Sequence, residues 1–320
     1  MKKLFRLALG IFISIFFLYL VFRKVNINEI IQIIVSSDTK YLVIALFLST
    51  FVLYIRCFRW RLILGSEHNK IKIINLFSSL CIGQMVNNIL PFRIGDITQA
   101  YMLGYKENCS KSVVFSTVVM KRLFDLVPPV MIIIIGSFFV LLPKQFNLFK
   151  ITIFFLLVII IVFTVIKSRK NVQKLIKTFL PESTLREKLV NLIENFYFGL
   201  QVINNKKIIF SICCYTLFIW LIYTMIVWAC SYAFDIKLNI LQTAIVMSIT
   251  AMSVIIPASP GYVGTWEAFA VLALKIFGIE KARAVSFALT YHFVSWLPVT
   301  ILGLYFFISS GISISQIQQD

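Results

Sequence analysis

The sequence of 320 residues has few charged side chains, only 14% of the total. A soluble protein of this length needs roughly a quarter of its residues charged to cover its surface. Hydrophobic residues reach 60%. This composition excludes a soluble domain and predicts an all-α, polytopic integral membrane protein, with residues 1–320 forming a single membrane domain.

Residues suited to metal, redox or nucleophilic chemistry are also scarce. The six cysteines include no C-x-x-C pair, and only two histidines occur, His68 and His292. The chain has neither a P-loop nor a G-x-S-x-G elbow. We therefore predict no metal, no cofactor and no catalytic residue, and we expect that the chain is not an enzyme.

Acidic residues are few, with 13 Asp and Glu against 31 Lys and Arg. In a soluble protein this excess would suggest nucleic-acid binding. Here most of the basic residues lie between apolar runs, where they set the orientation in the membrane. We predict no nucleic-acid partner.

Long apolar runs divide the chain into candidate membrane spans. The first run follows a basic N-terminus, and we expect it to remain as a signal anchor. The runs cover residues 7–22, 41–55, 73–90, 112–142, 151–166, 208–234, 238–256 and 284–309.

Two of these runs, 73–90 and 238–256, are short, and both end at prolines and glycines. Each chain segment then resumes as a short, partly apolar stretch. This pattern is typical of broken or re-entrant helix hairpins, whose irregular backbone lies inside the protein. The residues expected to break or bend the helices are Pro91, Gly95, Pro257, Pro260, Gly261 and Gly264.

The two breaks align with each other at an offset of 169 residues. This offset places Pro260 on Pro91 and Gly264 on Gly95, and Pro298 falls opposite Pro128 and Pro129. We therefore predict two repeats, at about 38–136 and 207–303.

If the two short runs are hairpins, about six full spans remain. With the N-terminus inside, 19 Lys and Arg lie on the cytoplasmic side and 9 outside. The hairpins then enter from opposite sides, so the repeats are inverted, as in many transporters. This topology predicts a multi-pass protein of the cell (inner or plasma) membrane, with both termini cytoplasmic. Alternatively, the short runs are complete spans, which gives eight or more helices.

The polar segment 167–207 separates the two repeats. Its basic residues and its helical spacing of apolar residues predict an amphipathic cytoplasmic linker. The segment either only satisfies topology or also attracts anionic lipid headgroups.

Ionisable residues inside apolar spans are costly and usually face a cavity or one another. Taken singly, Asp96 and Glu267 could only stabilise the first turn of a resuming helix. Lys121 and Asp125, four residues apart, could only form a buried pair. Taken together, the charges gather near the two breaks, and we expect one balanced central cavity that binds substrate. Its predicted members are Asn88, Arg93, Asp96, Lys121, Arg122, Asp125 and Glu267.

Three motifs resemble the lysylphosphatidylglycerol synthase transmembrane-region family, the flippase-like domain proteins, over about residues 10–310. The motifs are Asn88-x-x-Pro91-x-Arg93-x-Gly95-Asp96, Arg122-x-x-Asp125 and Pro257-x-x-Pro260-Gly261-x-x-Gly264-x-x-Glu267.

The sequence also departs from that family. Asp96 stands where Glu is common, and Lys121 stands where an acid often precedes the arginine. The exchange at Lys121 changes the local charge, so the substrate can differ from an aminoacylated lipid. We also expect that the chain lacks the soluble synthase domain.

The resemblance implies a flippase-like transporter of a lipid or lipid-linked glycan with an anionic phosphate headgroup. Arg122 would grip the phosphate, and Asp125 would orient its guanidinium. The alternatives are a membrane enzyme acting on a lipid or polyprenyl phosphate, or a non-catalytic partner of a separately encoded synthase or of glycan-assembly proteins.

Overall fold

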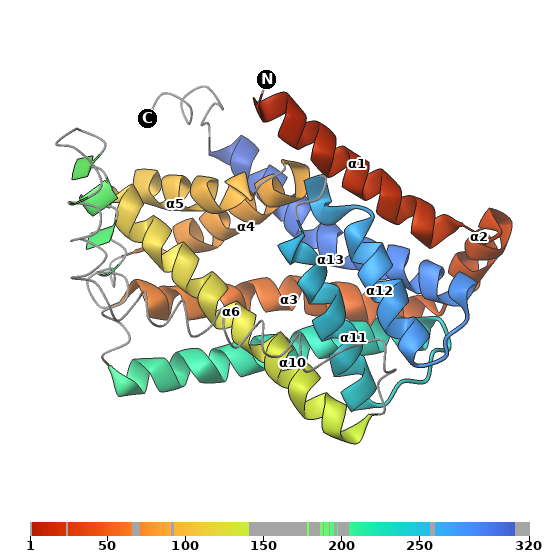
Figure 1. The fold of residues 1–320 in the computed structure, drawn as a ribbon. Coiled ribbons are helices and arrows are strands. Elements are labelled where there is room, and N and C mark those ends of the chain that lie inside the picture. The colour runs from red at the N-terminus through yellow and green to blue at the C-terminus, as the bar shows by residue number, and fades with distance from the viewer. Residues whose placement is uncertain are drawn as a thin grey trace.

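The computed structural model describes residues 2–23, 25–65, 71–90, 93–140, 205–256 and 260–310, and isolated positions between 178 and 197. Every regular element within these residues is a helix (Figure 1). The elements are α1 (Lys2–Phe22), α2 (Ile27–Val35), α3 (Thr39–Leu64), α4 (Ile73–Ile89), α5 (Ile94–Lys106), α6 (Lys111–Phe139), α10 (Lys206–Ala233), α11 (Ile240–Met252), η3 (Ser253–Ile255), η4 (Pro260–Tyr262), α12 (Thr265–Ile276) and α13 (Lys281–Ser309).

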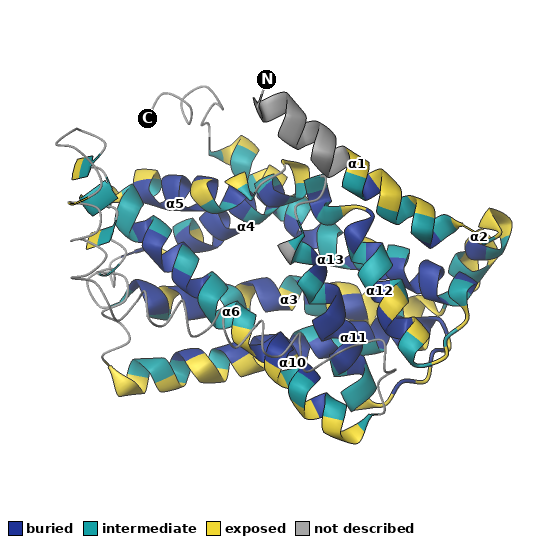
Figure 2. Cartoon of the chain, viewed as in Figure 1, coloured by how far each residue is buried: buried dark blue, intermediate teal, exposed yellow. Residues whose placement is uncertain are grey.

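The long helices have the length and the surface of membrane spans. Helices α3, α10 and α13 are each long and apolar enough to cross a bilayer. Their outward sides expose large apolar side chains such as Phe47, Phe210 and Ile308 (Figure 2). Lipid tails are as apolar as these side chains, so their exposure carries no penalty there. The prediction of an all-α polytopic membrane protein is confirmed.

The first predicted helix break is confirmed. Helix α4 ends at Ile89, and the chain folds back as α5, which begins at Ile94 and packs alongside α4. Arg93, directly before α5, has the left-handed φ of 53° that a reversal of this kind requires. Pro91 itself lies outside the described residues.

The second predicted break is also confirmed. Helix α11 ends at Met252, two short 3-10 turns follow, and α12 begins at Thr265. Gly261 and Gly264 have φ values of 69° and 91°, which glycine adopts at little cost. Pro260 opens the second 3-10 turn, and Pro257 lies outside the described residues.

Gly95 serves close packing, not the turn that the sequence suggested. A Cβ atom at Gly95 would overlap the Gly83 carbonyl oxygen, and one at Gly83 would lie 2.5 Å from the Cβ of Gln99. The absence of side chains at both glycines therefore lets α4 and α5 approach each other closely.

The order long helix, broken hairpin, long helix occurs twice among the described residues, in α3–α6 and in α10–α13. In Figure 1 the α4–α5 hairpin reaches the middle of the molecule from the left, and the α11–α12 hairpin reaches it from the right. Both closing helices carry internal proline: Pro128 and Pro129 in α6, and Pro298 in α13. This arrangement is the one expected of inverted repeats.

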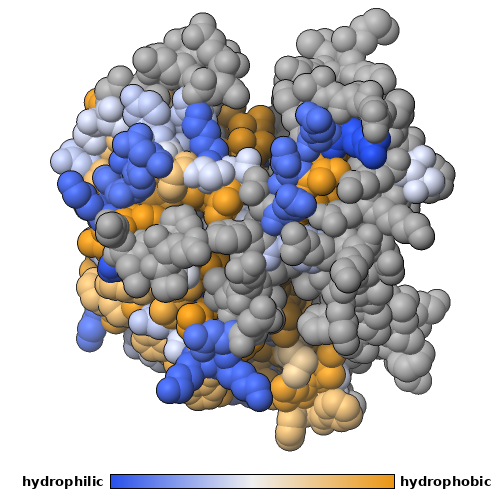
Figure 3. All heavy atoms as spheres, turned by 90° about the vertical axis from the view of Figure 1, so that its left-hand side faces the viewer, coloured by the Kyte–Doolittle hydropathy of each residue, from blue (hydrophilic) through white to orange (hydrophobic). Residues whose placement is uncertain are grey.

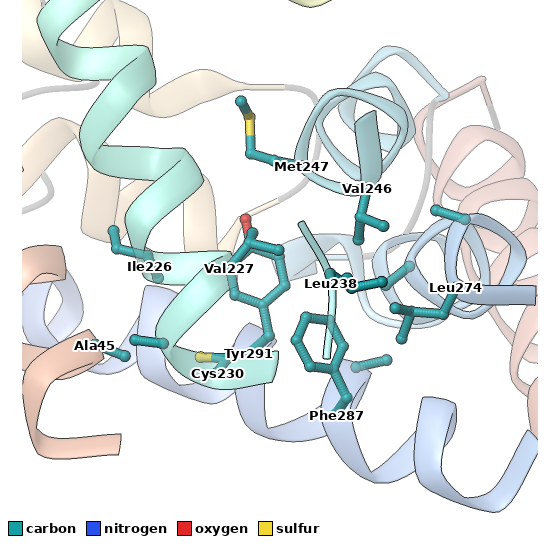
Figure 4. Packing of buried hydrophobic residues seen from close by; sticks show 14 of the residues in the cluster. Ala45, Ile226, Val227, Cys230, Leu238, Val246, Met247, Leu274, Phe287 and Tyr291 are labelled. Atoms are coloured by element: carbon teal, nitrogen blue, oxygen red, sulfur yellow. The ribbon is translucent and has the colours of Figure 1, made fainter. Parts of the chain in front are cut away.

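The largest buried apolar cluster joins the second group of helices to α3. Ala45 of α3, Cys230 of α10, Val246 of α11 and Phe287 of α13 meet within it (Figure 4). Helix α3 also packs along α10, so the first long helix of each group lies against the other. This shared core fixes how the two groups sit around the centre.

The boundary expected for the second span was wrong. The apolar run ends at residue 55, but α3 continues through Leu64 and carries Arg56, Arg59 and Arg61 as helical residues. Arg59 is 1% exposed and Arg56 is half-buried, so neither belongs to a loop. Without these two residues the expected count of inside positive charges falls from 19 to 17, against the same 9 outside.

Two other expected features, the span 151–166 and most of the linker 167–207, lie outside the described residues.

The left-hand end of Figure 1 is where α3 and α5 end and α4, α6 and α10 begin. On that face, groups of hydrophilic residues stand apart, with hydrophobic surface between them (Figure 3).

Candidate functional site

The tips of the two hairpins meet in the middle of the molecule. Nη2 of Arg93 donates to the Val254 carbonyl oxygen at 3.2 Å, which ties the first tip to the second. At the same junction, a Cβ atom on Gly261 would lie 3.0 Å from the Asn88 carbonyl oxygen. The expectation that the two breaks come together is therefore correct.

A cavity of about 350 Å³ lies beside this junction. Helices α3, α4, α6, α10, α11, α12 and α13 all contribute to its wall. Four of the seven predicted site residues line it: Asn88, Arg93, Arg122 and Asp125.

Arg122 is held by a carboxylate from the first hairpin. Its Nε and Nη2 atoms donate to the two Asp96 oxygens at 3.1 and 2.6 Å. Asn87 also donates to Asp96, at 3.1 Å. Asp96 thus acts from behind the cavity wall: it fixes the direction of the guanidinium that faces the cavity.

The predicted partnership of Arg122 with Asp125 was wrong. Asp125 accepts two hydrogen bonds from Arg59, at 2.6 and 3.0 Å, and Arg59 also donates to Thr216 at 3.1 Å. The planar guanidinium of Arg59, on α3, donates one hydrogen bond to each carboxylate oxygen. The buried Arg59 guanidinium thus joins α3 to α6 and α10 by charge-assisted bonds.

Lys121 does not line the cavity. Its side chain is 5% exposed, and its Nζ lies 4.2 Å from the centre of the Trp60 ring, a cation–π contact. The pair with Asp125 considered from their spacing does not form, because Asp125 pairs with Arg59. Lys121 therefore contributes a buried charge to the packing of α3 against α6.

Glu267 does not line the cavity either, but it supports a residue that does. Its Oε2 accepts from the Gly264 N–H at 2.7 Å, which caps α12, and its Oε1 lies 2.6 Å from Nδ1 of His292. The helix-stabilising role considered for Glu267 is thus real. His292 lines the cavity and stacks on Trp266, with ring centres 5.3 Å apart.

The lining contains an arginine that sequence reasoning placed in a loop. Arg56 faces the cavity from α3, next to Gln84 of α4. With the oxygen and nitrogen of the Gln84 amide exchanged, so that each faces a suitable partner, the oxygen accepts hydrogen bonds from Arg122 at 3.1 Å and from Arg56 at 3.3 Å. The i, i+3 spacing of Arg56 and Arg59, in continuation of a helical run, was the available signal.

The expectation of a balanced cavity was wrong, because Arg56 and Arg59 add two positive charges. Asp125 is neutralised by Arg59, and Asp96 by Arg122. Within the described part of the chain, no carboxylate pairs with Arg56 or Arg93. The cavity wall therefore carries a positive excess inside the membrane region, an arrangement that favours an anionic ligand.

The rest of the wall combines amide, hydroxyl and aromatic side chains with a similar number of aliphatic residues. The polar members include Ser49, Asn87 and Ser295, and six tryptophans and tyrosines come from α10, η4, α12 and α13. The aromatic members are far apart in sequence and form no motif, so sequence reasoning did not find them.

Comparisons with known proteins agree with this architecture. The family model described as the lysylphosphatidylglycerol synthase TM region matches residues 7–303. A UPF0104 membrane protein of Methanocaldococcus jannaschii is 25% identical over 94% of this chain and 94% of its own length. Another, of Pyrococcus horikoshii, is 22% identical over 95% of this chain and 96% of its own. The names of these relatives state a membrane protein and no activity.

Proposed function

We propose that this chain, which belongs to the lysylphosphatidylglycerol synthase TM region family, moves a lipid with an anionic phosphate headgroup between membrane leaflets. The resemblance noted in the sequence is thereby confirmed as family membership. The transport activity, its substrate and its direction belong to the proposal.

The observation that carries the proposal is the positive cavity at the junction of two opposed hairpins. The guanidinium group of arginine binds phosphate through two parallel hydrogen bonds. In a low-dielectric site each of these bonds is stronger than in water. A lipid phosphate can reach a membrane-embedded site directly from the bilayer. The cavity is large enough for one headgroup, and the lipid chains would extend between the helices.

Opposed hairpins suit alternating access. Each tip reaches the centre from its own side of the membrane, and the contact of Arg93 with Val254 holds the tips together. Movement of either hairpin would open the cavity towards one leaflet. We propose that the protein lies in the cell membrane with both termini cytoplasmic, because this orientation puts the larger number of Lys and Arg inside. Its substrate would come from a separately encoded synthase or from glycan-assembly proteins.

The test is leaflet exposure of a fluorescent phospholipid in vesicles reconstituted with the protein. Arg122→Lys keeps the positive charge but loses the planar guanidinium and its paired hydrogen bonds. A hydrogen bond to a charged group contributes about 1.5–3 kcal/mol. We expect the transport rate to fall by roughly tenfold or more. Lys237→Gln is the matched control, because Lys237 is 81% exposed and lies outside the cavity.

Wild-type rates from a well-folded Arg122→Lys protein would contradict the assignment. Equal losses from Arg122→Lys and Lys237→Gln would contradict it as well. Recovery of a chemically altered lipid from the vesicles would instead indicate a membrane enzyme.

A further inference from the structure

The aromatic lining of the cavity differs from the composition of the chain. Of the 48 Phe, Tyr and Trp residues, 31 are Phe. A wall assembled without selection would therefore be mostly Phe, yet no described lining residue is Phe. The aromatic lining residues are Trp220, Tyr223, Tyr262, Trp266, Tyr291 and Trp296.

Tryptophan and tyrosine differ from phenylalanine by their polar atoms. Each combines a flat apolar face with an N–H or O–H group that can hydrogen-bond. A cavity for lipid tails would gain nothing from those polar atoms, because hydrocarbon offers no partner. A cavity for a headgroup with both apolar faces and hydroxyl groups would use both parts of each ring.

Several polar atoms in this wall also lack partners. Ser49 Oγ, Asn87 Oδ1, and the indole nitrogens of Trp220 and Trp266 are buried without a hydrogen bond among the described residues. All four residues line the cavity. Four of the ten unpaired buried polar atoms among the described residues thus belong to side chains of this wall. Buried polar groups are nearly always paired, so these four favour a polar ligand.

The charge of the wall decides between two ligands that aromatic side chains favour. Tryptophan and tyrosine faces also attract quaternary ammonium groups. Arg56, Arg93 and Arg122 line the same cavity, however, and would repel a choline or a lysyl ammonium group. A sugar ring is neutral, its C–H faces stack on aromatic rings, and its hydroxyls pair with polar ring atoms and amides.

The two walls lie on different helices. Arg56, Arg93 and Arg122 belong to α3, the start of α5, and α6, whereas the aromatic residues belong to α10, η4, α12 and α13. We propose that the headgroup is a sugar phosphate: the arginine wall holds the phosphate, and the aromatic wall holds the sugar ring. This inference rests on the proposed function and narrows its substrate to a lipid-linked glycan.

The test is binding of purified protein in nanodiscs, measured by native mass spectrometry and by quenching of tryptophan fluorescence. The probes are a polyprenyl phosphate bearing one hexose, the same polyprenyl phosphate without sugar, phosphatidylglycerol and lysyl-phosphatidylglycerol. We expect the hexose to tighten binding about tenfold over the bare polyprenyl phosphate, through several hydrogen bonds and one stacked ring. Lysyl-phosphatidylglycerol should bind most weakly.

Variants locate the sugar site. Trp296→Phe and Tyr262→Phe keep a ring in place and remove its polar atom, so the gain from the hexose should shrink in both. Trp228→Phe is the control, because Trp228 packs on Tyr41 and Tyr232 and does not line the cavity. The Trp228→Phe variant should bind both polyprenyl phosphates as the unmodified protein does, and thermal unfolding of all three variants reports that they fold.

Equal binding of the two polyprenyl phosphates would overturn the sugar assignment and leave phosphate-lipid transport intact. Tightest binding of lysyl-phosphatidylglycerol would also overturn it. Failure of every phosphate lipid to bind would instead contradict the proposed function itself.

Discussion

The two groups of helices around the cavity, α3–α6 and α10–α13, share an order of elements but differ in chemistry. The first group supplies the arginines and the amides Gln84, Asn87 and Asn88 of the wall. The second group supplies its tryptophans and tyrosines. The comparison teaches that the order of elements can repeat while the cavity-lining side chains diverge.

The divergence can be followed at equivalent positions. At the offset of 169 residues, Arg93 corresponds to Tyr262. Both have a left-handed φ, 53° and 59°, and both line the cavity. Arg122 corresponds to Tyr291 at the same offset, and these two also line it. Two cations in the first group thus stand where the second group has phenol rings.

Each group also has one carboxylate in the first turn of its resuming helix, Asp96 in α5 and Glu267 in α12. Asp96 holds Arg122, whereas Glu267 caps its own helix and holds His292. In both groups the carboxylate lies behind the wall and positions a nitrogen-bearing side chain that faces the cavity. Asp96 and Glu267 are therefore positioning residues, and the Arg122 and His292 side chains face the cavity.

The largest expected effect separates two arginines on one helix. Arg59→Ala should lower the free energy of unfolding by about 3–5 kcal/mol, because it leaves the Asp125 carboxylate without its buried partner. Thermal unfolding in detergent would measure the loss.

The control is Arg56→Ala, three residues earlier on α3. Arg56 faces the cavity, so its removal should cost less than about 1 kcal/mol of stability but weaken binding of phosphate lipids. Equal destabilisation by the two changes would show that Arg59 and Arg56 do not differ in role, with one stabilising the fold and the other facing the cavity.

A smaller effect tests the close packing of the first hairpin. Gly95→Ala places a Cβ atom against the Gly83 carbonyl oxygen and 2.6 Å from the Asn87 nitrogen. Neither backbone atom can move freely, so we expect a loss of about 1–3 kcal/mol. Because Asp96 is the next residue, phosphate-lipid binding should fall as well, as measured by native mass spectrometry.

Gly278→Asn provides the matched control for Gly95→Ala. Gly278 has a positive φ, 75°, which Gly95 lacks, and a Cβ atom there would have nothing within 4 Å. Asparagine tolerates this left-handed backbone after a helix, so the change should cost less than about 1 kcal/mol. A stable Gly95→Ala protein with normal binding would refute the need for close contact between α4 and α5.

The helix breaks could be predicted from the sequence because proline and glycine act locally. Gly261 accepts a positive φ whatever surrounds it, and Pro260 begins a new turn, whereas Pro128, Pro129 and Pro298 lie inside continuous helices. The element order followed from the same local signals and from the apolar runs. The end of α3 was misplaced because an apolar run stops at its first charge, whereas a helix continues when a charge is paired inside the protein.

The partners of the charges could not be predicted, because they depend on packing between distant helices. Arg59 and Asp125 are 66 residues apart, and Arg122 and Asp96 are 26 apart. Spacing along α6 suggested that Asp125 serves Arg122 or Lys121, but α3 and α5 supply better-oriented partners. The aromatic side of the cavity could not be predicted for the same reason, because its residues belong to four separate elements.

The smallest expected effect concerns Lys121, the one cation of the predicted site that faces away from the cavity. Its ammonium group lies over the Trp60 ring, and burial of a cation is costly. Lys121→Met keeps the length, removes that charge and places a sulfur against the ring. We therefore expect a change in stability within about 1 kcal/mol, and phosphate-lipid affinity within roughly threefold of wild type because Lys121 touches no ligand. Arg122→Lys, at the next position of α6, is the comparison, since it alters a residue that lines the cavity. If Lys121→Met lowered the affinity as much as Arg122→Lys does, Lys121 would take part in binding. The set of cations that hold the phosphate would then include a residue behind Trp60.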